Sequence, residues 1–122
     1  MPRVILIEDD ALVRKLLEKR LVAAGHEVIA LPDGRKLQEV LDRTQADMLL
    51  IDMGLPYGNG LTLVEKIRAQ GIATPIMILT AYDLPRLSEM VRSIGANDLF
   101  LKPYDQEVLI ARIDSMIAKK AA

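Results

Sequence analysis

Five short apolar runs alternate along the chain with longer segments whose apolar residues recur every three or four positions. The runs cover residues 4–7, 26–30, 47–51, 75–79 and 99–101. Continuous runs of this kind are typical of strands buried on both faces of a sheet. The longer segments have the 3.6-residue period of helices that are apolar on one side.

Residues that commonly begin or end helices flank these longer segments. Asp10 and Asp105 stand where an N-cap is expected, and Gly25 and Gly95 follow the first and fourth segments. Residues 53–60 contain three glycines and a proline, so a loop is expected there. The predicted apolar faces consist of Val13, Leu16, Leu17, Leu21 and Ala24; Leu37, Val40 and Leu41; Leu61, Val64 and Ile67; Leu87, Met90, Val91 and Ile94; and Leu109, Ile113, Met116 and Ile117.

Five strands that alternate with five helices predict an α/β fold with a parallel sheet, because parallel neighbours need crossover connections. A closed barrel of eight such units takes about 250 residues, whereas this chain has 122. We therefore expect an open, doubly wound sheet in one domain over residues 1–122.

Composition narrows the class of protein. The net charge is −1 with 27% charged residues, so no basic excess favours nucleic acid. Cysteine is absent, which fits a reducing compartment, and no apolar run approaches the ~20 residues of a membrane span. Expected is a soluble cytoplasmic protein that binds neither nucleic acid nor membrane directly.

Polar residues stand where the apolar runs stop. Glu8 and Asp9 follow the first run, Asp52 the third, Thr80 the fourth and Lys102 the fifth. The carboxyl ends of parallel strands converge at one edge of an open sheet, where such folds place their sites. Carboxylates there can bind Mg²⁺, and that cation would let Asp52 approach a phosphoryl group as a nucleophile. Each residue also has a plain structural interpretation, as a cap, a loop anchor or a solvated surface charge.

In their order and spacing these residues resemble the receiver domain of two-component response regulators, the superfamily of the chemotaxis response regulator. The resemblance covers the whole chain and rests on residues 5–10, 52–56 with Gly60, 80–81, 95–96 and 102–103. It implies the flavodoxin-like strand order 2-1-3-4-5. In the family, the peptide bond that matches Lys102–Pro103 is often cis.

The resemblance assigns a role to each site residue. Asp52 matches the aspartate phosphorylated by a sensor histidine kinase or a histidine phosphotransfer protein. Glu8 and Asp9, with Asp52 and the backbone carbonyl of Gly54, match the Mg²⁺ ligands. Lys102 matches the lysine that contacts the phosphoryl group, and Thr80 the switch hydroxyl. Such a phosphoprotein catalyses only its own phosphorylation and dephosphorylation, so it is not otherwise an enzyme.

One residue of the expected switch departs from the family pattern. Receivers commonly carry Tyr or Phe three residues before the lysine, where this chain has Leu99. The chain's only phenylalanine, Phe100, is the next residue, which a strand turns to the opposite face. Leu99 cannot make the ring motion that accompanies the Thr80 switch, so the effect on signal output stays open.

The resemblance implies an output surface on the fourth helix, fifth strand and fifth helix. It would contact a downstream protein, an output domain missing from this chain, or a second copy of the chain in a homodimer. A complete single-domain regulator and a fragment of a larger protein both fit.

Two other classes of protein are alternatives to a phosphorylated receiver. An aspartyl-phosphate hydrolase needs an aspartate two residues after its nucleophile, where Gly54 stands. A pseudo-receiver, which binds proteins without phosphorylation, usually lacks one of the acids, the acceptor or the lysine. All are present here, but Leu99 keeps that alternative in view.

Overall fold

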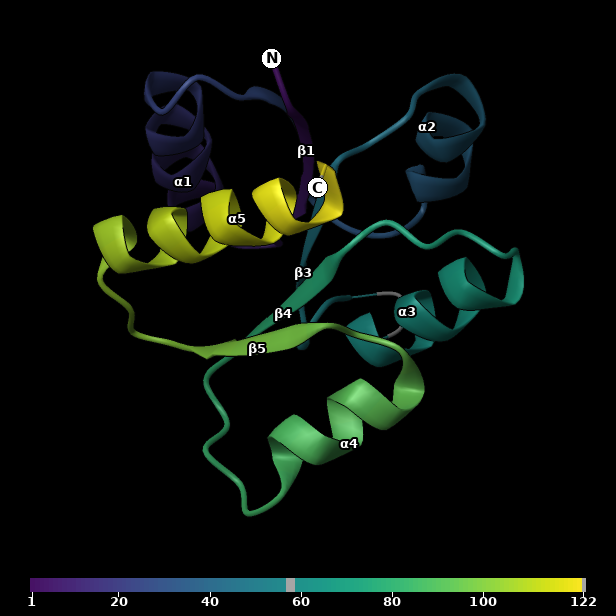
Figure 1. Cartoon of the computed structure of the whole chain (residues 1–122). Coiled ribbons are helices and arrows are strands. Elements are labelled where there is room, and N and C mark those ends of the chain that lie inside the picture. Colours follow the sequence, from purple (N-terminus) through teal and green to yellow (C-terminus); the bar gives the residue numbers. More distant parts are fainter. Residues whose placement is uncertain (57–58, 122) are drawn as a thin grey trace.

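The computed structural model describes residues 1–56 and 59–121. Part of the predicted loop at 53–60, residues 57 and 58, lies outside this range. Strands and helices alternate as predicted (Figure 1). The strands are β1 Arg3–Ile7, β2 Glu27–Leu31, β3 Met48–Asp52, β4 Ile76–Thr80 and β5 Asp98–Leu101. The helices are α1 Ala11–Ala23, α2 Leu37–Arg43, α3 Gly60–Ala69, α4 Leu87–Ile94 and α5 Gln106–Ala121.

The five strands form one parallel sheet in the order β2-β1-β3-β4-β5, which confirms the predicted topology. The helices cover its two faces (Figure 1). Residues of α1 and α5 pack with one set of strand side chains, and residues of α2, α3 and α4 pack with the alternate set. The chain is thus doubly wound, with a core on each side of the sheet.

The fifth strand shows this alternation at the two residues that matter for the switch. Leu99 packs on the cluster beneath α2, α3 and α4, whereas Phe100 packs on the cluster beneath α1 and α5. Phe100 also meets the Tyr104 ring edge-on, with 6.1 Å between ring centroids. The aromatic ring therefore faces away from Leu99's side of the sheet, as expected from strand geometry.

The caps of the first and last helices are confirmed. The Asp10 carboxylate accepts hydrogen bonds from the amides of Leu12 and Val13, both at 3.0 Å. Asp105 caps the start of α5 in the same way. Gly95 follows α4 with φ 129°, a conformation that residues with a side chain rarely adopt.

Three residues predicted on buried helix faces are exposed: Leu16, Ala24 and Met90. The faces are narrower than the sequence pattern suggested, because each helix rests on the sheet by a thin stripe. In α1 this stripe is Leu17 and Leu21, and in α4 it is Leu87 and Val91.

All five strands differ by one residue from the predicted bounds at one end or both. Strands β1 and β5 each begin one residue earlier than predicted. Strands β2, β3 and β4 each begin and end one residue later, since pairing continues further along the chain. Asp52 pairs with Leu79 and Thr80 with Leu101. Asp52 and Thr80 are therefore the last residues of their strands, which fixes their backbones within the sheet.

None of the helices in the described part of the chain is long and apolar enough to cross a membrane.

Candidate functional site

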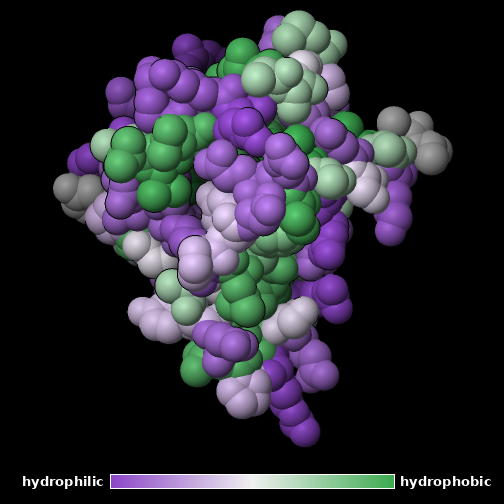
Figure 2. Space-filling model, turned by 90° about the vertical axis from the view of Figure 1, so that its left-hand side faces the viewer, coloured by the Kyte–Doolittle hydropathy of each residue, from purple (hydrophilic) through white to green (hydrophobic). Residues whose placement is uncertain are grey.

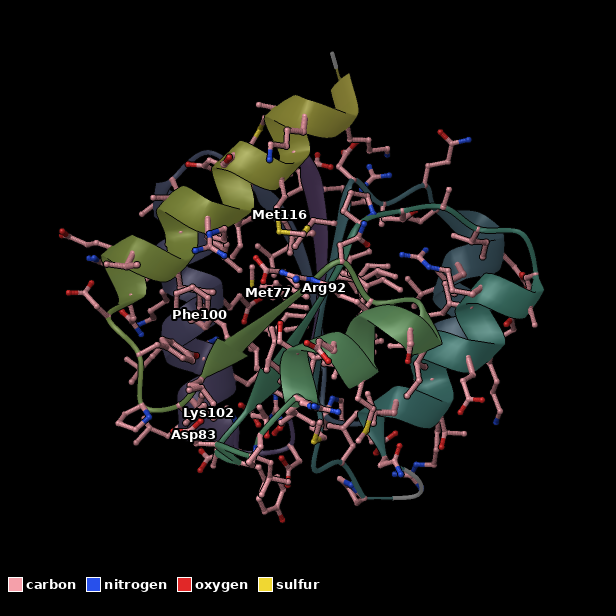
Figure 3. All side chains as sticks on the ribbon, turned by 60° about the horizontal axis from the view of Figure 1, so that its bottom comes forward. Met77, Asp83, Arg92, Phe100, Lys102 and Met116 are labelled. Atoms are coloured by element: carbon pink, nitrogen blue, oxygen red, sulfur yellow. The ribbon has the colours of Figure 1, made fainter. Side chains whose placement is uncertain are left out.

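The candidate site lies at the carboxyl edge of the sheet. Glu8 follows β1, Asp52 ends β3, Thr80 ends β4, and Lys102 follows β5. Figure 3 shows Lys102 at the same end of the molecule as Asp83 of the β4–α4 connection. Parallel pairing of β1, β3, β4 and β5 brings these strand ends together although they are far apart in sequence.

Lys102 bridges the two buried acids. Its Nζ donates to Glu8 Oε1 at 2.7 Å and to Asp52 Oδ2 at 3.2 Å. Glu8 is 1% exposed and Asp52 7% exposed, so both carboxyl groups lie in surroundings that disfavour uncompensated charge. The peptide bond that follows Lys102 is cis, as the resemblance implied.

Three carboxyl groups converge closely enough to share one cation. Glu8, Asp9 and Asp52 each offer an oxygen, and these oxygens all lie within 4.8 Å of one another. Asp9 is exposed, so the cluster opens to solvent on one side. Mg²⁺ typically binds a few hard oxygen ligands and keeps several water molecules, and this cluster offers such a set of donors.

Gly54 lies beside this cluster. Its amide donates to Asp52 Oδ1 at 3.2 Å, which orients the carboxylate. A Cβ added at Gly54 would meet no atom within 4 Å, so the space next to it is open. The role of its carbonyl as a metal ligand remains a prediction.

Burial and mutual contact shift the pKa values of the two acids in opposite directions. The pKa of Glu8 is raised to about 7, by burial first and then by its hydrogen bond with Asp52. Burial would also raise the pKa of Asp52, but the Glu8 hydrogen bond and the Lys102 ammonium outweigh it and lower that pKa. Below the Glu8 pKa and without metal, Asp52 is therefore the ionised member of the pair.

The carboxylates likewise determine the state of Lys102. Burial would lower the pKa of this ammonium, but the hydrogen bond to Glu8 and the charge of Asp52 raise it. Lys102 thus stays protonated and available as a charge-assisted donor next to Asp52.

Thr80 is close by but is not bonded to the acids. Its buried hydroxyl donates to the sulfur of Met53 at 3.6 Å and accepts from the Tyr82 amide at 3.0 Å. Sequence reasoning missed Met53, because it lies next to Asp52 with no chemistry-bearing group of its own.

Arg14 is a second residue that the sequence did not single out. Its guanidinium reaches back from α1 and donates to the Glu8 carbonyl at 2.9 Å and to the Asp9 carbonyl at 3.5 Å. It therefore fixes the backbone that carries two of the clustered acids. A helical arginine five or six residues after an acidic pair was the only available signal.

The site combines an ionised, buried aspartate with an ammonium group that contacts it and with an acid cluster able to bind a cation. Such a combination is suited to handling a phosphoryl group. Comparisons with known proteins give the same class. The response regulator receiver domain model matches residues 4–114, and the chain belongs to this family of two-component signalling domains.

The curated relatives are longer than this chain. The virulence transcriptional regulatory protein PhoP of Salmonella choleraesuis is 34% identical over 121 residues, which are 99% of this chain and 54% of that protein. The transcriptional regulatory protein PhoP of Escherichia coli is 32% identical, over 98% of this chain and 53% of its own length. The chain thus spans about half the length of these relatives.

Solved receiver domains have the same fold over nearly the whole chain. The Francisella response regulator 1452 receiver domain has a TM-score of 0.93 at 25% identity, and the match covers 98% of this chain and 99% of that one. The BeF3-activated N-terminal receiver domain of Klebsiella pneumoniae RstA has a TM-score of 0.86 at 31% identity, with coverage of 94% and 97%.

Proposed function

We propose that Asp52 is the phosphoacceptor of this receiver domain and takes its phosphoryl group from a sensor histidine kinase or a histidine phosphotransfer protein. The observation that carries this proposal is the placement of Asp52 in the acid cluster and in contact with the Lys102 ammonium. A buried aspartate that stays ionised is a competent nucleophile.

The reaction is a transfer between two nucleophiles. An Asp52 oxygen forms a new P–O bond as the P–N bond of the phosphohistidine breaks, and the bond's electron pair returns to the imidazole. Lys102 Nζ already contacts Asp52, so it can follow the charge that accumulates on the phosphoryl oxygens. The product is an acyl phosphate on Asp52, and the domain acts on no other substrate.

Glu8, Asp9, Asp52 and the Gly54 carbonyl would hold Mg²⁺. The bound ion would neutralise part of the negative charge shared by the carboxylates and the incoming phosphoryl group. Arg14 keeps the backbone of Glu8 and Asp9 in place for this role.

The signal would pass on through Thr80, with Leu99 in place of the usual aromatic partner. Because Thr80 ends β4, a shift of its side chain acts on the β4–α4 connection. The output surface would be α4, β5 and α5. It would contact a downstream protein, an output domain or a second copy of the chain, without direct contact of this domain with nucleic acid or membrane.

The phosphodonor has to dock where it can reach Asp52. A largely apolar groove reaches the site at Lys102. Its other lining residues are Val13, Leu16, Ala81, Pro103, Tyr104 and Gln106. Figure 2 views the molecule from the side of α1 and shows hydrophobic side chains gathered into patches between hydrophilic ones. We assign this groove to the phosphohistidine-bearing protein, and we expect the two proteins to meet in the cytoplasm.

The proposed unit is residues 1–122 as one receiver domain. The alternative, a pseudo-receiver that binds partners without phosphorylation, is less well supported. Such a protein has no need for an ammonium bonded to an ionised, buried acid, and here that arrangement is intact.

Intact mass after incubation with acetyl phosphate and Mg²⁺ tests the proposal. We expect a gain of one phosphoryl group, since the small donor bypasses kinase docking. Asp52→Ala should abolish the gain. Asp83→Ala removes an exposed acid at the same end of the molecule and should leave the gain unchanged. Absence of the gain in the parent, also with a kinase-derived phosphodonor, would support the pseudo-receiver.

A further inference from the structure

The hydroxyl of Thr80 has a weak acceptor in a place where water does not reach. Thr80 is 1% exposed, and its hydroxyl donates to the Met53 sulfur at 3.6 Å. Within residues 1–56 and 59–121, that thioether is the one acceptor for this donor. A thioether is a poor acceptor, whereas a buried hydroxyl without any acceptor is costly. The contact is therefore sufficient to orient the hydroxyl, but a stronger acceptor can readily replace the sulfur.

Backbone hydrogen bonds anchor Met53 next to Thr80. The Met53 amide donates to the Leu79 carbonyl at 2.8 Å, next to Thr80 on β4. The Met53 carbonyl accepts from the Gly60 amide at 2.9 Å, at the start of α3. The side chain packs on the core beneath α2, α3 and α4, as Leu99 does. The backbone of Met53 is thus anchored beside the phosphoacceptor, and its side chain reaches the Thr80 hydroxyl.

We infer that Met53 is a positioning residue that holds the Thr80 hydroxyl in its resting orientation and so sets the domain's affinity for a phosphoryl group. A phosphoryl oxygen on Asp52 offers a charged acceptor, and charge-assisted hydrogen bonds are about twice as strong as neutral ones. The hydroxyl therefore forms a stronger hydrogen bond when it moves from the sulfur to the phosphoryl group. The loss of the sulfur contact offsets part of that gain in free energy.

The same contact bears on the missing aromatic residue. Leu99 has no polar atom and cannot accept a hydrogen bond from Thr80. Met53 is long, unbranched and adaptable, so its side chain can repack when the hydroxyl departs. In this chain the side chain that responds to Thr80 is therefore next to the phosphoacceptor itself rather than on β5. This inference rests on the proposed function.

The test measures the dissociation constant of beryllofluoride, a phosphoryl mimic, in the presence of Mg²⁺ by isothermal titration calorimetry. Met53→Leu keeps the volume and removes the sulfur acceptor. We expect the dissociation constant to fall about two- to tenfold, the range for the loss of one modest hydrogen bond from the resting state. The matched control is Met77→Leu, a buried methionine of β4 that packs beneath α1 and α5 and should leave the constant unchanged.

A double-mutant cycle separates the hydroxyl from packing. In a Thr80→Ala background no hydroxyl remains to be held, so Met53→Leu should have no effect on the dissociation constant. An equal effect in both backgrounds, or no difference between Met53→Leu and Met77→Leu in the parent, would overturn the role of Met53. If the parent itself binds no beryllofluoride while thermal unfolding shows it to be folded, the proposed function fails instead.

Discussion

Glu8 carries a folded-state pKa of about 7, against an ordinary value of 4.5, and this makes it a source of pH-dependent stability. Between these two values the unfolded chain releases a proton that the folded protein still holds. The free energy of unfolding therefore falls as pH rises through this window, and the penalty is complete above the folded pKa. Asp52 titrates below the window, since its pKa is lowered from 3.8.

Glu8→Gln removes this titration while it keeps a polar side chain. In metal-free buffer, we expect the unfolding free energy of the parent relative to Glu8→Gln to fall by about 1–3 kcal/mol between pH 5 and pH 7.5, at about 1.4 kcal/mol per pKa unit. Urea titrations of both proteins at several pH values measure it. Groups that do not contact Glu8 are the same in both proteins, so their contributions cancel in the difference. A constant difference across this range would contradict the assigned pKa.

The convergence of Glu8, Asp52 and Lys102 could be predicted because topology alone brings it about. A residue at the carboxyl end of a parallel strand has a known place, whatever its side chain does. The contacts of Arg14 and Met53 could not be predicted in this way. Arg14 spans five or six residues to reach two carbonyl groups, and Met53 meets Thr80 only through the pairing of β3 with β4. Both depend on side-chain orientations that no sequence pattern encodes.

At the scale of elements, Arg68 ties three segments together on the side of the sheet that carries α3 and α4. Its Nε donates to the Gly95 carbonyl at 2.8 Å, which joins α3 to the end of α4. One Nη donates to the carbonyl groups of Ile72 and Thr74 at 2.7 and 2.9 Å, and the other to the Asn97 side chain. These bonds supply donors to several carbonyl groups near the amino end of β4 that would otherwise need water as a hydrogen-bond partner.

Arg68→Met keeps much of the apolar stem and removes the guanidinium. We expect the unfolding free energy to fall by about 2–4 kcal/mol, because partly buried carbonyl groups lose a charged donor. Urea unfolding followed by circular dichroism measures the loss. Lys66→Met, an exposed position on the same helix, should change it by less than about 0.5 kcal/mol. Equal effects of the two substitutions would show that the network adds no stability.

The elements themselves were predictable to within about one residue for the strands, while the helix faces were drawn too wide. Apolar runs that are buried on both sides leave little choice of structure, as the fully buried β3 and β4 show. Met90 fits the helical period of α4 but is 50% exposed, because only Leu87 and Val91 of that helix are fully covered by the sheet and α3. Periodicity gives the direction of a helix face, and its width depends on what covers it.

At the scale of the whole molecule, the two faces of the sheet have different relations to the site. Thr80 continues directly into residues 81–86, which are exposed and end at Arg86 in a left-handed conformation with φ 61°. Helix α4 follows at once and rests on the core by Leu87 and Val91. On the far edge of the sheet, β2 and α2 have no such connection to β4. A change at Thr80 should therefore act on one part of the molecule.

Hydrogen–deuterium exchange with and without beryllofluoride and Mg²⁺ tests this asymmetry. We expect exchange to change in residues 81–94, because a movement of Thr80 is passed directly to the segment that follows it. Exchange in residues 27–43 should stay within error. A shift between two existing conformers gives such a local change without loss of the fold. Asp52→Ala under the same conditions should show neither change. A uniform change over both segments would point to general stabilisation by ligand, and no change in residues 81–94 would mean that the phosphoryl signal leaves the site by another route.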